Sequence, residues 1–87
     1  MKIVINKSYG GFHISTAAKE WMEKKYGSAS MDRTSDALID CIMSLGTARA
    51  SGHNSSLKVV DIPDNVDWMI ENYDGIEWVS EKHRTWG

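Results

Sequence analysis

Residues 66–82 have the sequence VDWMIENYDGIEWVSEK, which carries the clearest local signal in the 87-residue chain. Asp74-Gly75 is a dipeptide typical of the two-residue turn that joins the strands of a β-hairpin. Apolar and polar residues alternate on both sides of this dipeptide, with the period of a half-buried strand. We therefore expect a hairpin whose strands run over 66–72 and 76–82.

The alternation also assigns the side chains of this hairpin to two faces. The residues expected to face the core are Val66, Trp68 and Ile70 in the first strand and Ile76, Trp78 and Ser80 in the second. The residues expected to face solvent are Asp67, Met69, Glu71, Glu77, Val79 and Glu81. Like charges on the outer face disfavour pairing with a further strand.

Outside the hairpin, the sequence pattern predicts two more strands and two helices. An apolar β-branched run indicates a strand over 2–7, and another is expected over 57–62. One helix is expected to run to Tyr26, with Ser15 or Thr16 as its cap and Gly27 as its stop. A second begins near Ser35 and either ends at Gly46 or continues toward Gly52.

This order, β-α-α-β-β-β, predicts a single α+β domain over residues 1–87. We expect the two helices to pack on one face of a small mixed or antiparallel sheet of about four strands. The long helical segment between the first and second strands favours a parallel pairing of these two.

The residue inventory excludes several classes of site. Cys41 is the only cysteine, so neither an internal disulfide nor a multi-cysteine zinc site is possible. His13, His53 and His83 lie in three separate regions, which predicts no metal site. Cys41 flanks an apolar helix stripe and is expected to be packed rather than nucleophilic. Since no catalytic set is recognisable, we expect a protein that is not an enzyme and needs no cofactor.

The sequence also favours a location in the cytoplasm. No apolar run approaches the roughly 18–20 residues of a membrane span. The opening residues are too short an apolar run for a signal-peptide core, and a lone thiol suits a reducing compartment. We expect no membrane partner.

Charge is distributed unevenly along the chain. Residues 59–87 contain seven Asp or Glu and two Lys or Arg, whereas residues 1–58 contain five acids and eight bases. A surface of one sign steers association with an oppositely charged partner, and an acidic one disfavours direct nucleic-acid binding. A merely solvated face is the alternative. The residues predicted to contact a basic partner are Asp67, Glu71, Asp74, Glu77, Glu81 and Trp86.

Four tryptophans are many for so short a chain. Trp21, Trp68 and Trp78 fall on predicted inward faces, so we expect them in the core. Trp86 is one residue from the end and is expected either to dock on the sheet or to lie in an interface, where tryptophan is enriched.

The segment Ser8-Tyr9-Gly10-Gly11 lies between a predicted strand and a predicted helix, as anion-binding loops do. It lacks the Lys-Ser end of a P-loop and the third glycine of a dinucleotide fingerprint. The simpler interpretation is that the backbone needs a positive φ there. The alternative is a small-nucleotide site formed by Asn6, Tyr9, Gly10, Gly11 and either Arg33 or Arg49.

Four segments resemble a family of short proteins from bacteriophages and prophages. They are MKIVINKSYGGF at 1–12, LKVVDIP at 57–63, YDGIE at 73–77 and EKHRTW at 81–86. The likeness extends over nearly the whole chain. Family members commonly have a cysteine where this chain has Ser8 and a proline where it has Asp36, so chemistry that uses that cysteine does not transfer.

The resemblance implies a phage-encoded accessory protein in a host cell. Together with the acidic segment, it leads us to expect a non-enzymatic inhibitor of a host defence protein, such as a component of a CRISPR system. The acidic hairpin would then cover a basic, nucleic-acid-binding surface of that protein. The alternatives are a protein that sequesters a nucleotide signal through Gly10-Gly11, and a phage assembly protein that forms a homo-oligomer.

Overall fold

The computed structural model describes residues 1–81 and confirms the α+β class and the order of the elements. Its elements are β1 (Lys2–Asn6), α1 (Thr16–Tyr26), α2 (Asp36–Leu45), α3 (Thr47–Ala50), β2 (Leu57–Asp61), β3 (Trp68–Tyr73) and β4 (Ile76–Glu81). The short helix α3 follows Gly46 directly, so the chain turns at this glycine and then continues as helix.

The helix caps are the ones that the sequence predicts. The Ser15 hydroxyl accepts a hydrogen bond from the Ala18 N–H at 3.0 Å, and α1 ends at Gly27 with a φ of 86°. The Ser35 hydroxyl accepts from the Leu38 N–H at 3.3 Å at the start of α2. These contacts satisfy backbone groups that would otherwise lack partners at the helix ends.

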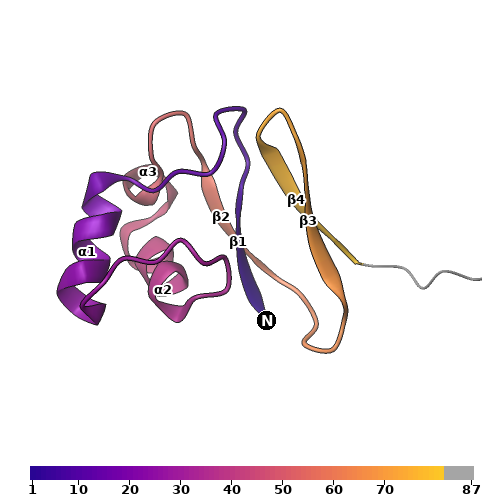
Figure 1. The fold of residues 1–87 in the computed structure, drawn as a ribbon, viewed down its shortest axis with the longest axis horizontal. Coiled ribbons are helices and arrows are strands. Elements are labelled where there is room, and N and C mark those ends of the chain that lie inside the picture. Colours follow the sequence, from indigo (N-terminus) through magenta and orange to yellow (C-terminus); the bar gives the residue numbers. More distant parts are fainter. Residues whose placement is uncertain (82–87) are drawn as a thin grey trace, which may run out of the picture.

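The four strands form two antiparallel ribbons, β1–β2 and β3–β4. Figure 1 shows β1 lying between β2 and the β3–β4 hairpin. The predicted parallel pairing of the first and second strands is therefore wrong. The helical segment leaves β1 and returns at the same end of it, because the Lys7 N–H donates to the Ser56 carbonyl at 2.8 Å and Ile14 bridges Ser51. A strand that starts beside the end of β1 must run back along it.

The core lies between the helices and the β1–β2 ribbon. Its buried residues are Val4, Ala18, Met22, Leu38, Cys41, Ile42, Ala50 and Leu57, and Trp21 packs partly buried against them. The Cys41 sulfur lies 3.6 Å from the Ala18 carbonyl oxygen, and burial raises the pKa of the thiol. Cys41 is thus a packing residue, as predicted.

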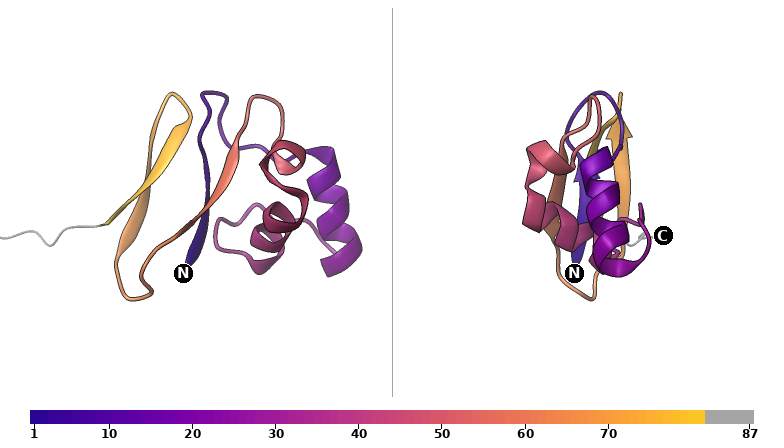
Figure 2. Two further views of the ribbon diagram at one scale, coloured as in Figure 1. Left: turned by 180° about the vertical axis from the view of Figure 1, so that it is seen from behind. Right: turned by 90° about the vertical axis from the view of Figure 1, so that its left-hand side faces the viewer.

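The hairpin stands outside this core. The helices lie on one side of the β1–β2 ribbon and the hairpin on the other (Figure 2). None of the residues 68–81 belongs to the core cluster, and none of them is among the partly buried hydrophobic residues that pack against it. The hairpin instead lies beside the edge of β1 that β2 leaves free, so its two faces meet no helix.

This placement overturns part of the predicted facing of β4. Glu77, expected in solvent, is only 7% exposed, while Trp78, expected in the core, is 40% exposed. Trp68 is half-buried rather than part of the core. The prediction assumed that the apolar positions would turn toward a helix layer, but the hairpin packs against the polar edge of β1.

Candidate functional site

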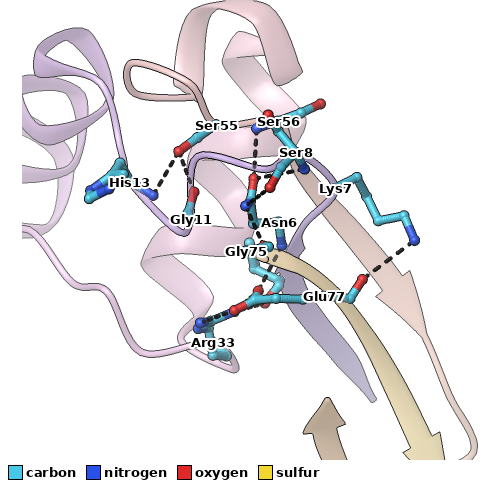
Figure 3. A network of polar contacts seen from close by, with 11 residues as sticks. Asn6, Lys7, Ser8, Gly11, His13, Arg33, Ser55, Ser56, Gly75 and Glu77 are labelled. Carbon is cyan, nitrogen blue, oxygen red and sulfur yellow. Dashed lines mark hydrogen bonds and ion pairs between the residues drawn. The ribbon is translucent and has the colours of Figure 1, made fainter. Parts of the chain in front are cut away.

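An ion pair joins the hairpin to the rest of the protein. The Arg33 guanidinium donates two hydrogen bonds to the Glu77 carboxylate, one of them at 2.8 Å, and a third to the Val4 carbonyl at 3.2 Å. The same carboxylate accepts from the Asn6 N–H at 2.8 Å (Figure 3). Glu77 therefore fastens β4 to β1, and the prediction that it is exposed beside the other acids is wrong.

The pKa of Glu77 reflects the contacts of its carboxylate. Burial by itself raises this pKa, but the hydrogen bonds from Arg33 and Asn6 and the Arg33 charge outweigh burial and hold it below its usual value. The carboxylate is thus ionised at neutral pH and paired where it lies.

The polar atoms of the Asn6 side chain are likewise used in hydrogen bonds within the protein. Its side-chain amide donates to the Gly75 carbonyl at 2.8 Å and to the Ser8 carbonyl at 2.7 Å. Its side-chain oxygen accepts from the Ser56 N–H at 2.8 Å. This fully buried side chain therefore ties the hairpin turn, the loop after β1 and the start of β2 together (Figure 3).

The glycines of the predicted ligand loop serve close packing. A Cβ at Gly10 would lie 2.0 Å from the Asn54 carbonyl oxygen, and Gly11 has a φ of 88°. With Asn6 buried and Arg33 paired to Glu77, the geometry does not assemble the proposed nucleotide site. Tyr9 is exposed in the loop after β1, and Arg49 is exposed on α3.

The outward side of the hairpin has a different character. We call it the open face, and it comprises Met69, Glu71, Tyr73, Ile76, Trp78 and Ser80, which alternate along the two strands. Met69 is 42% exposed, Tyr73 69% and Trp78 40%. Large apolar side chains that gather on one exposed face are typical of binding surfaces.

Glu71 is held in place at the centre of the open face. Its carboxylate accepts a hydrogen bond from the Trp78 indole N–H at 3.0 Å and another from the Ser80 hydroxyl. Both donors are neutral groups, so these hydrogen bonds fix the position of the carboxylate without an ion pair. The result is an oriented anion beside an exposed indole ring.

The other acids of the segment divide into paired and unpaired groups. Asp61 lies 3.4 Å from the Lys2 ammonium, and both Asp61 and Asp64 contact the amino group of Met1. Among residues 1–81, no cationic group is paired with Asp67, Glu71, Asp74 or Glu81. No Lys or Arg occurs between 59 and 81. These four acids therefore have no compensating positive charge within residues 1–81.

The sequence contains a signal for the open face that the predicted assignment of side chains to the two faces of the hairpin did not use. A two-residue turn at Asp74-Gly75 places Tyr73 opposite Ile76 and Glu71 opposite Trp78, and residues opposite each other share a face. Glu71 and Trp78 could not then point to opposite sides. Counting outward from the turn would have found this pair.

Two predicted features have no outcome in the structure. Trp86, expected either to dock on the sheet or to lie in an interface, and His83 lie outside the described residues. Within residues 1–81, no three His, Cys, Asp or Glu side chains are grouped so that they could hold a metal ion. None of the described helices is long and apolar enough to cross a membrane.

Comparison with known proteins identifies no relative. No family model matches the chain, and neither a curated protein nor a solved structure is significantly similar to it.

Proposed function

We propose that this chain is a non-enzymatic binding protein whose hairpin attaches to a basic surface of a partner protein. The observation that carries the proposal is the open face, where the oriented Glu71 carboxylate lies among the exposed side chains of Met69, Tyr73 and Trp78. The unpaired acids Asp67, Asp74 and Glu81 extend the same charge over the hairpin.

The chemistry of the open face suits lysine and arginine side chains. A cation placed over a tryptophan or tyrosine ring is attracted by the ring, and more strongly where water is excluded. Glu71 adds a fixed opposite charge beside the Trp78 ring. Long basic side chains also bury their methylene groups on apolar surface, which Met69 and Tyr73 supply.

The resemblance of the sequence to phage proteins supports a host protein as the partner. A host defence protein that holds nucleic acid has the basic surface that an acidic hairpin would cover, and covering it would inhibit the protein. The host cytoplasm is the compartment in which the two would meet. A homo-oligomer built through the open face is disfavoured, because it would bring the acidic hairpins of two copies together.

The test is a pull-down from a bacterial host lysate with matched variants. The chain, the triple variant Met69→Ala/Tyr73→Ala/Trp78→Ala and the control Met43→Ala are immobilised in parallel at low and high salt. Met43 is 65% exposed on α2, so the control removes an exposed methionine elsewhere. We expect the chain and the control to retain one basic protein at low salt, and high salt to weaken the capture.

Two results would contradict the proposal. One is retention of the same protein by the triple variant, which would place the contact elsewhere. The other is a captured partner that is acidic and insensitive to salt. The melting temperatures of the chain, the triple variant and Met43→Ala serve as the control for folding.

A further inference from the structure

A small groove lies on the side of the hairpin opposite the open face. It has a volume of about 180 Å³ and is lined by Ile62, Pro63, Val66, Trp68, Val79 and Glu81. The segment that connects β2 to β3 forms one wall, and the ends of β3 and β4 form the other.

The size of the groove restricts what can occupy it. Pockets for cofactors and small-molecule ligands measure about 300–1,000 Å³. At about 180 Å³, this groove is too small for a nucleotide and has room for a single long side chain.

The lining restricts the occupant further. Five of its six residues present apolar surface, including the Trp68 ring, and Glu81 is the only one that carries a charge. No cationic group within residues 1–81 is paired with Glu81. An aliphatic stem that ends in a cation matches both features, because the stem packs on the apolar walls and the cation meets the carboxylate.

We infer that this groove receives an arginine or lysine side chain of the partner that binds the open face. The inference rests on the proposed function and names a second contact point for it. The groove and the open face are separated only by the outer edge of β3, since the neighbours Trp68 and Met69 point to opposite sides. A basic segment that passes around this edge reaches both.

The test is an NMR titration of the ¹⁵N-labelled chain with three small probes. Nα-acetyl-arginine amide carries the cation, the citrulline analogue keeps the shape without the charge, and the norleucine analogue keeps only the apolar stem. We expect the arginine probe to shift the Trp68 indole and Val79 amide signals at the lowest concentration. Glu81→Gln should weaken this binding about two- to five-fold, whereas the control Glu23→Gln, which removes an exposed acid on α1, should leave it unchanged.

Three outcomes would overturn the inference. Equal binding of the norleucine and arginine probes would define an apolar groove without charge selection. Binding unaffected by Glu81→Gln would remove the carboxylate from the site. Shifts confined to the Trp78 indole and its neighbours would reject the groove while leaving the proposed function intact. The pull-down tests the proposed function separately from the groove, because the triple variant changes the open face and leaves the groove residues unchanged.

Discussion

At the scale of single residues, the Arg33–Glu77 pair holds the hairpin to β1. Glu77→Gln would leave the guanidinium without its counter-charge at a site where the arginine side chain is only 26% exposed. Breaking a buried pair from one side costs about 3 kcal/mol or more. We expect a loss of about that size in the free energy of unfolding, measured by urea denaturation.

The exposed Glu23→Gln on α1 is the matched control, with an expected change of about 0.5 kcal/mol or less. A similarly small change for Glu77→Gln would show that the pair contributes little. The hairpin would then be held mainly by its other contacts, such as the hydrogen bonds of Asn6 and Lys7 to the Gly75 and Glu77 carbonyls.

The same pair predicts a pH dependence. The pKa of Glu77 is lowered in the folded protein, so its contribution to stability is complete above the ordinary glutamate pKa of about 4.3. It is lost as the pH falls through the lowered folded-state value. The stability difference between the chain and Glu77→Gln should therefore be constant from pH 7 to 5 and shrink below about pH 4. A difference that grows on acidification would contradict this account.

At the scale of elements, the hairpin turn is fitted against the loop after β1. A Cβ at Gly75 would lie 2.5 Å from the Tyr9 carbonyl oxygen, and Gly75 has a φ of 95°. Gly27 has a similar φ of 86° but no atom within 4 Å of such a Cβ. A side chain at either glycine would strain the backbone, but only one at Gly75 would also clash with a neighbouring segment. Comparing the two substitutions therefore distinguishes the cost of strain from the cost of the clash.

We expect Gly27→Ala to cost about 1–2 kcal/mol, the usual cost of a left-handed conformation. Gly75→Ala should cost clearly more, because the loop at Tyr9 must also move. Thermal unfolding of both variants measures the difference. Equal losses would mean that the turn and the loop are not in close contact.

The sequence predicted the elements better than their mutual arrangement. Ser15, Ser35 and the Asp74-Gly75 turn act locally, and the structure confirms all three. The direction of β2 and the burial of Glu77 depend on contacts between segments far apart in the chain, which no local pattern encodes. The partner Arg33 lies in a connector 44 residues from Glu77, so only the folded chain brings them together.

The candidate site was predicted in part. Glu71 and the other unpaired acids were identified from charge alone, and their exposure agrees with that choice for Asp67, Asp74 and Glu81. The aromatic half of the open face was missed because Trp78 was assigned to a core that does not extend to the hairpin.

At the scale of the whole molecule, the residues of the core and the residues proposed to bind a partner lie in separate parts of the fold. The core between the helices and β1–β2 contains no hairpin residue among those described. We expect the triple variant Met69→Ala/Tyr73→Ala/Trp78→Ala to lose about 1.5 kcal/mol or less, at roughly 0.5 kcal/mol for each surface position. Leu38→Ala in the core should cost about 2–5 kcal/mol. A larger loss for the triple variant than for Leu38→Ala would contradict this separation.

The central claim is that the open face is where a partner binds, and photo-cross-linking in host cells tests it most directly. We would place p-benzoylphenylalanine at position 73, where the native tyrosine is 69% exposed, and separately at position 43 on α2. After irradiation, the account predicts a single adduct with a basic protein from position 73 and none from position 43. No adduct from position 73, or the same adducts from both positions, would contradict it.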